Sequence, residues 1–249
     1  MQMIHCNDIF HIHTYRCGHA EDVDDEAYVE KAINLCAKGI WFTDHAPFPG
    51  DPFGNRMRYE QLEEYLSSLT DLKKKYDGII DIHIGLEIEY FPSFSRSGYY
   101  RHLREDPRIE SLLLGQHMAE DRRSPGLYTF AWKKDNLQKY EYKALGDAEI
   151  KGIKSGYFDV IAHPDRIFRR CKEWTPEMDA IADRIISAAV KKDIPLEINM
   201  HSVKCKGHYW NQFWEKVPAG TKVLVGLDAH SLSDMERRYE RAQSWDKYL

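Results

Sequence analysis

Short apolar runs rich in β-branched residues alternate along this chain with stretches of helical periodicity, and this alternation constrains the fold more than any other feature. Seven runs read as strands: residues 8–13, 39–44, 80–90, 111–117, 158–164, 194–200 and 222–228. The segments that read as helices are 24–39, 59–78, 175–193 and 231–245. Strands separated by helices favour a parallel sheet, because parallel neighbours need crossover connections.

The positions of the polar residues bear on how that sheet is arranged. An open doubly wound sheet concentrates its site at one switch point, whereas a closed (β/α) barrel collects its chemistry at the ends of many strands. Six of the seven runs carry histidine, aspartate or glutamate at or close to their ends. This pattern favours a closed ring, and the chain length suits one barrel-type domain.

Bulk composition argues against several classes of protein. No run of 18 apolar residues occurs, so no transmembrane helix is expected. The first ten residues lack a basic region followed by an apolar stretch, which argues against a secretory signal. The net charge of −5 argues against a general nucleic-acid binder. Five cysteines without a CxxC pair argue against a disulfide framework or zinc ribbon, and free thiols suggest the cytoplasm.

The residues at the strand ends are ligands of a kind that metals prefer. His11 and His13 alternate on one strand, so both rings are expected on the same face. Glu87 interrupts an apolar strand, where a carboxylate costs several kcal/mol unless it is paired or binds a cation. The candidate metal ligands are His11, His13, His19, His45, Glu87, His117, His163, Asp228 and His230.

Imidazole and carboxylate together are the ligand set of zinc, iron and manganese sites. Nine such residues are too many for one ion and suit two or three divalent ions, with Glu87 bridging. A multinuclear site generates a nucleophile from water and stabilises an anionic transition state. The sequence therefore predicts a hydrolase, most naturally one that acts on a phosphate ester.

Five stretches occur in the order that a known family shows. "HIHTYRCGH", "TDHAP", "GLEIEY", "AHPD" and "GLDAHS" resemble the PHP (polymerase and histidinol phosphatase) superfamily of metal-dependent phosphoesterases over almost the whole chain. The segment "NRMRYEQLEEYLSSLTDLKKKYDG" before "IGLEIEY" further resembles its histidinol-phosphatase branch. The resemblance implies an α/β fold, a distorted (β/α)7 TIM-like barrel spanning 1–249 as one PHP-type domain. Its metal site would lie at the C-terminal ends of the strands.

The resemblance also implies how the ligands are shared and what they do. His11, His13, Glu87 and Asp228 would hold a first metal; His19, His45 and His230 a second; and Glu87, His117 and His163 a third. A hydroxide bridging two metals would attack phosphorus in line. The expected reaction is hydrolysis of L-histidinol phosphate to L-histidinol and phosphate, in histidine biosynthesis. The expected partner is thus a small phosphorylated substrate, with neither nucleic acid nor membrane involved.

Two residues beside the "AHP" motif are candidates for contact with the substrate. Arg166 suits a phosphate by bidentate hydrogen bonding, or a pair with Asp165 or another carboxylate. Asp165 is a candidate catalytic residue, either as the leaving-group acid or as an orienter of a ligating imidazole.

One stretch departs from the family pattern. The chain reads "GQH" at 115–117, where histidinol phosphatases carry G-S-x-H, so the pocket beside His117 is in question. The segment 119–136 follows directly and contains Tyr128, Phe130 and Trp132. These aromatics either shape substrate choice or pack on the barrel.

Three rival functions remain open. The same site could act on another small phosphomonoester, a nucleotide or phosphotyrosine. C–N or C–O hydrolysis occurs in other barrels that begin with HxH, but these often use a lysine at a strand end, and none is found here. A metal-binding regulatory module would have lost ligands, whereas all nine expected positions are filled.

Overall fold

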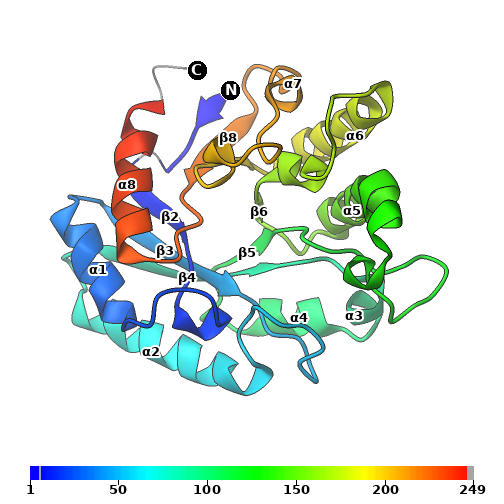
Figure 1. Ribbon diagram of the computed structural model, residues 1–249. Coiled ribbons are helices and arrows are strands. Elements are labelled where there is room, and N and C mark those ends of the chain that lie inside the picture. Colours follow the sequence, from blue (N-terminus) through cyan, green and yellow to red (C-terminus); the bar gives the residue numbers. More distant parts are fainter. Residues whose placement is uncertain (6, 246–249) are drawn as a thin grey trace.

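One parallel sheet of eight strands forms the centre of the protein (Figure 1). The structure is a computed structural model and describes residues 1–5 and 7–245. The strands are β1 (Gln2–Met3), β2 (Asp8–Ile12), β3 (Gly39–His45), β4 (Asp81–Ile88), β5 (Ser111–Leu114), β6 (Val160–Ile161), β7 (Leu196–Asn199) and β8 (Lys222–Gly226). All seven predicted strands are confirmed, and the two-residue β1 is an addition that the apolar runs did not indicate.

The sheet curls so that its two ends meet at β8. Its strand order is β1-β8-β7-β6-β5-β4-β3-β2. β1 pairs with the beginning of β8, through Gln2 and Lys222. β2 meets the residues after β8, where Leu227 N donates to Phe10 O at 2.8 Å and His13 N donates to Ala229 O at 3.0 Å. The predicted TIM-like α/β barrel is confirmed as a distorted ring.

Helices surround this sheet (Figure 1). Their bounds are α1 (Asp25–Asn34), α2 (Leu62–Lys75), α3 (Pro92–Arg96), α4 (Tyr99–Glu105), α5 (Lys134–Ser155), α6 (Pro176–Lys192), α7 (Asn211–Trp214) and α8 (Leu232–Gln243). Four of them fall on the predicted segments. The longest, α5, was not predicted. α1 ends at Asn34, before the predicted end at Gly39, and Gly39 is the first residue of β3.

Apolar side chains fill both sides of the sheet. The larger cluster lies between the strands and the helices and includes Tyr28, Phe42, Tyr65 and Leu69. A smaller cluster is drawn from strands β2, β5, β6 and β8 and their ends: Phe10, Leu113, Val160, Ala162 and Leu224. Residues from strands this far apart in the order meet only inside the ring, so this cluster forms an apolar floor beneath the polar strand ends.

A hydroxyl cap starts α6. Thr175 Oγ1 accepts a hydrogen bond from Met178 N at 3.3 Å, and Pro176 occupies the first helical position. We expect Thr175→Ala to lower the free energy of unfolding by about 1 kcal/mol. Urea denaturation measures this, with Thr175→Ser as the control that keeps the hydroxyl. An unchanged midpoint for Thr175→Ala would show that the cap contributes nothing.

No helix of residues 1–5 and 7–245 is long and apolar enough to cross a membrane. Within these residues Cys17, Cys36, Cys171 and Cys205 carry free thiols. Cys6, the remaining cysteine, lies outside the described residues.

Candidate metal centre

Glu87, near the end of β4, lies at the centre of a group of imidazoles. Its side chain is 1% exposed, and its two oxygens face different histidines. Oε2 lies 3.0 Å from His45 Nδ1, 3.4 Å from His11 Nε2 and 3.5 Å from His13 Nε2. Oε1 lies 2.7 Å from His163 Nε2 and 3.6 Å from His117 Nε2. One carboxylate therefore joins five of the seven predicted histidine ligands.

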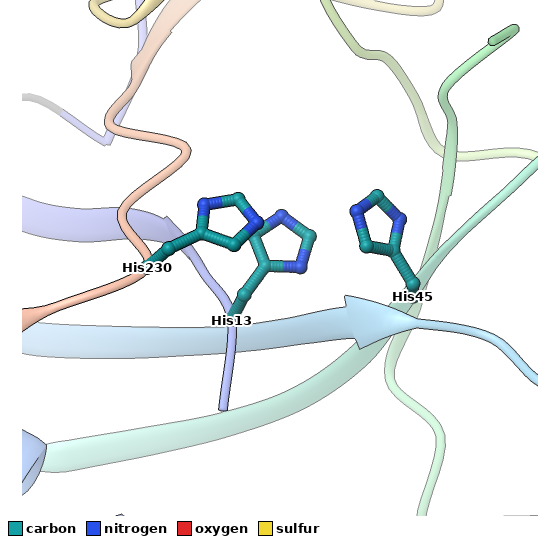
Figure 2. Close-up of side chains that lie close together, drawn as sticks. All are labelled: His13, His45 and His230. Atoms are coloured by element: carbon teal, nitrogen blue, oxygen red, sulfur yellow. The ribbon is translucent and has the colours of Figure 1, made fainter. Parts of the chain in front are cut away.

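Asp228 joins the remaining side of the group. Its Oδ1 lies 3.5 Å from His13 Nε2 and 3.6 Å from His230 Nδ1. Figure 2 shows His13, His45 and His230 converging from three segments that are far apart in sequence, and His13 and His230 stack with ring centroids 4.2 Å apart. His19 is exposed at the rim, with its ring 4.6 Å from that of His230. All nine predicted ligands thus lie in one cluster.

The backbone is strained at three of these residues. His11, His163 and Asp228 have φ values of 70°, 35° and 52°, in the left-handed region that side-chain-bearing residues avoid. His11 also lies where the register of β2 against β3 shifts, as at a β-bulge that redirects a side chain. Such strain costs about 1–3 kcal/mol per residue and gathers at functional sites.

The unpaired polar atoms of the cluster test whether it fits metal ions. Several buried atoms have no hydrogen-bond partner among the described residues: His11 Nε2, both ring nitrogens of His13, Glu87 Oε2 and His230 Nε2. Leaving such atoms unpaired costs about 1–3 kcal/mol each, which a bound cation would offset. Two ligands about 2.1 Å from one ion are about 3.4 Å apart at the tetrahedral angle. The separations of 3.4–3.6 Å around Glu87 and Asp228 fit that spacing.

The other ring nitrogen of several histidines is already occupied. His11 Nδ1 donates to Glu197 Oε1 at 2.5 Å, and His117 Nδ1 donates to Glu89 Oε1 at 3.2 Å. The Nδ1 atoms of His19 and His230 donate to backbone carbonyl oxygens, each at 3.1 Å. A proton held on Nδ1 leaves the lone pair of Nε2 free for a metal. Four of the imidazoles are therefore held in the tautomer that a ligand needs.

Burial sets the charge state of two more histidines. Desolvation, with the neighbouring His13, lowers the pKa of His45 to about 4. Desolvation, with the nearby Arg166, lowers the pKa of His163 to about 4 as well. Both imidazoles are then neutral at pH 7, which is the state that binds metals.

Glu197 in β7 is a functional residue that the sequence analysis missed. It is fully buried, and Oε1 accepts from His11 Nδ1 at 2.5 Å. Oε2 accepts from His163 N at 2.9 Å and from Asn199 Nδ2 at 3.1 Å. One carboxylate thus orients His11 and the strained turn at His163. Its signal, a glutamate inside the apolar run "IPLEINM", is the same one that identified Glu87.

Two further carboxylates support other imidazoles. Asp44 Oδ1 lies 3.6 Å from His13 Nδ1, while Oδ2 accepts from the Thr14 hydroxyl. Glu89 Oε1 accepts from His117 Nδ1 at 3.2 Å, and both Glu89 oxygens accept from the Arg56 guanidinium at 2.9 Å and 3.1 Å. The hydrogen bond to Glu89 fixes the orientation of the His117 ring beside Glu87.

The departure at "GQH" does not displace His117. Gly115 lies against Glu87, and a Cβ there would stand 2.0 Å from Glu87 Oε1. The Gln116 side chain is turned away from the imidazoles, because its Oε1 accepts from Tyr90 N at 3.0 Å. The shortened stretch therefore leaves room for the central carboxylate and still brings His117 to it.

Arg166 lies at the centre, and Asp165 does not. Arg166 Nη2 donates to Asp228 Oδ2 at 2.5 Å, so its carboxylate partner is Asp228 and not Asp165. Asp165 Oδ2 accepts from Trp210 N at 2.8 Å and Trp214 Nε1 at 3.1 Å, on the far side of its turn. Within the described residues Asp165 supports the segment around α7, and no hydrogen bond or ion pair joins its side chain to the nine ligands.

The aromatics of the 119–136 segment face two ways. Tyr128 is buried against Phe53 with ring centroids 4.6 Å apart, whereas Phe130 beside it is 58% exposed. Trp132 Nε1 donates to Asp121 Oδ2 at 3.0 Å. Trp132 lines a groove against α5 instead of the metal cluster. Packing on the barrel therefore accounts for Tyr128, and of the three aromatics of this segment Phe130 has the largely exposed ring.

Two curated relatives share sequence with the chain. The Deinococcus radiodurans protein named "Probable histidinol-phosphatase" is 30% identical over 168 residues, which is 62% of this chain and 59% of that protein. The Bacillus subtilis protein named "Histidinol-phosphatase" is 37% identical over 90 residues, which is 34% of each chain. The chain thus spans about three fifths and one third of the lengths of these relatives.

Solved structures share the fold. A Listeria monocytogenes structure described as a candidate histidinol phosphatase, HisK, has a TM-score of 0.77 at 19% identity and covers 97% of this chain and all of its own. A Lactococcus lactis histidinol phosphate phosphatase, solved with zinc, L-histidinol and phosphate, has a TM-score of 0.66 at 18% identity, with 97% and 94% covered. The profile of the PHP domain matches residues 10–201, more than half of the chain. The chain therefore belongs to the PHP domain family.

Proposed function

We propose that the chain is a metal-dependent phosphomonoesterase whose substrate is L-histidinol phosphate. The observation that carries this proposal is the ring of seven imidazoles around Glu87 and Asp228. The names of the two curated relatives support the substrate. The free thiols of the four described cysteines support a cytoplasmic location.

The nine clustered residues would hold two or three divalent ions of zinc, iron or manganese, with Glu87 shared between ions. His11, His13 and Asp228 form one group of donor atoms within 4.8 Å of one another, and His45, Glu87 and His117 form another. His45 also groups with His13 and His230, and His19 groups with Cys17 and His230, so His45 could serve either the ion of Glu87 and His117 or the ion that the family resemblance assigns to His19, His45 and His230. When bound, such ions supply Lewis acidity toward a phosphate and a nucleophile derived from water.

The residues around the ions orient the reaction. Glu197 and Glu89 hold His11 and His117 by their Nδ1 atoms, so that the free Nε2 atoms face inward, and Asp44 lies 3.6 Å from His13 Nδ1. The Arg166 guanidinium, fixed by Ser202 Oγ at 3.0 Å and Asn199 Oδ1 at 2.8 Å, lies beside Asp228. We propose that it binds a phosphate oxygen of the substrate.

Phosphate release from L-histidinol phosphate, beside a panel of other phosphomonoesters, tests the substrate. The protein is reconstituted with manganese or zinc, and a Glu87→Gln preparation controls for a contaminating phosphatase. We expect a kcat/KM of about 10⁴ M⁻¹s⁻¹ or more for histidinol phosphate, well above the panel. A preference for a nucleotide or phosphotyrosine would overturn the proposed substrate but would leave phosphomonoester hydrolysis as the reaction. If none of the esters is hydrolysed, both the proposed substrate and the proposed reaction are wrong.

Arg166→Lys tests the proposed phosphate contact. Lysine keeps the charge but cannot make the forked contacts of a guanidinium. We expect KM for the phosphate ester to rise about tenfold, the loss of one charged hydrogen bond, while metal content stays constant. Steady-state kinetics and metal analysis separate the two. Loss of metal in step with activity would show instead that Arg166 acts through Asp228.

A further inference from the structure

A groove lies outside the metal centre. It encloses about 1000 Å³ between α3, the loop that follows His117, and one face of α5. The loop and the two helices lie on the same side of the molecule in Figure 1. None of the nine clustered residues lines it. Its size is that of a pocket for a small organic ligand.

The acidic side chains of the groove are used within the protein. Glu120 accepts from the backbone amides of Ser93 at 3.0 Å and Gly126 at 3.3 Å. Asp121 accepts from the amides of Arg123 and Ser124 at 2.8 Å and 3.1 Å, and from Trp132 Nε1. Asp147 pairs with Arg122 at 3.5 Å and Arg184 at 3.1 Å. These carboxylates shape the loop and are already satisfied.

Three basic side chains of the groove have no such partner. Arg96 from α3, Arg123 from the loop and Lys151 from α5 form no ion pair within the residues that the structure describes. All three are exposed. Cations from three separate elements that face one concave surface favour a ligand with more than one negative charge.

Aromatic rings line the same groove. Trp132 is half-buried and held by Asp121, and Tyr140 on α5 is 49% exposed. Lys143 Nζ lies 5.6 Å from the Tyr140 ring centroid, and its own ion pair is with Glu177. A large exposed tyrosine beside cations suits a ligand that carries a planar ring as well as charge.

We propose that this groove binds a small ligand that combines phosphate groups with a planar ring, of the class of a nucleoside diphosphate. Arg96, Arg123 and Lys151 contact the phosphates, and Trp132 and Tyr140 contact the ring. The site is separate from the proposed reaction, since no residue of the groove belongs to the metal centre. Hydrolysis and groove binding can therefore fail independently.

Isothermal titration of the metal-loaded protein with ADP, with adenosine and with inorganic phosphate tests the proposal. We expect saturable ADP binding at least tenfold tighter than that of adenosine or phosphate. The double variant Arg123→Glu/Lys151→Glu should weaken ADP at least tenfold. The control is Lys38→Glu/Lys192→Glu, which makes the same charge change at two exposed lysines outside the groove. The control should bind ADP as the unaltered protein does.

Tyr140→Ala separates the ring from the charges. This substitution should weaken the affinity for ADP and leave the affinity for phosphate unchanged. Tyr140 is 49% exposed, so its removal leaves no cavity in the core, and thermal unfolding checks the folding of every variant. If the Arg123→Glu/Lys151→Glu variant still binds ADP with unchanged affinity, ADP binds elsewhere, as at the metal centre, and the proposed groove site is wrong. Equal affinity for phosphate and ADP would overturn the ring contact. Absence of saturable binding by all three probes would overturn the proposal outright.

Discussion

Replacing Glu87 with glutamine is expected to remove most of the bound metal and to lower kcat/KM by roughly 1000-fold, about 4 kcal/mol of transition-state stabilisation. Glu87 contacts five imidazoles through two oxygens, so the amide removes a charge shared by the whole cluster. Changes to the residues that merely orient ligands cost about 10–100-fold in metal affinity, and a central ligand should cost more. Metal analysis after dialysis and phosphate release measure the two losses.

Glu149 in α5 provides a matched control. It is also a buried glutamate, but both of its oxygens lack a hydrogen-bond partner among the described residues. Desolvation, with Asp165 nearby, raises its pKa well above the usual value, so burial favours the neutral acid, which glutamine resembles. Glu149→Gln should therefore keep full metal content and turnover. A Glu87→Gln protein that does the same would overturn the multinuclear assignment.

The strand ends could be predicted from the sequence because two simple rules act together there. Parallel strands place their carboxyl ends at one edge, and an ionisable residue inside an apolar run needs a charged or metal partner. These rules located Glu87 and the histidines without knowledge of any contact. They apply equally to Glu197, whose run of apolar residues was read only as a strand.

Residues that depend on close packing could not be predicted in the same way. α5 carries Gly146 and Gly152, which weaken a helix when it is considered alone. A Cβ at Gly146 would meet Ile181 at 2.6 Å, and one at Gly152 would meet Leu114 at 2.7 Å. Both glycines allow close contacts with other elements, which local helix propensity does not take into account. The sequence pattern therefore did not indicate a helix here. The side-chain direction of Asp165 is likewise decided by Trp210 and Trp214, which are 45 and 49 residues away in the sequence.

Gly226→Ala is expected to disable the centre from a position that contacts no metal ligand directly. Gly226 ends β8, and a Cβ there would stand 1.6 Å from Glu197 Oε1 and 2.4 Å from its carboxyl carbon. Glu197 is fully buried, so it has no free space to enter. We expect a loss of about 1–3 kcal/mol in the free energy of unfolding, as for other overpacked cores. Metal affinity should fall as His11 loses its Nδ1 acceptor.

Comparison with two other variants separates packing from charge. Glu197→Gln keeps the shape and removes the charge, so we expect metal affinity to fall about 10–100-fold with little change in stability. Gly54→Ala, where a Cβ meets nothing within 4 Å, should change neither property. Chemical denaturation and metal titration of all three variants give the comparison. If Gly226→Ala binds metal as the unaltered protein does, Glu197 does not position His11. If it loses metal affinity while Glu197→Gln keeps it, the shape of that buried carboxylate, and not its charge, holds the imidazole in place.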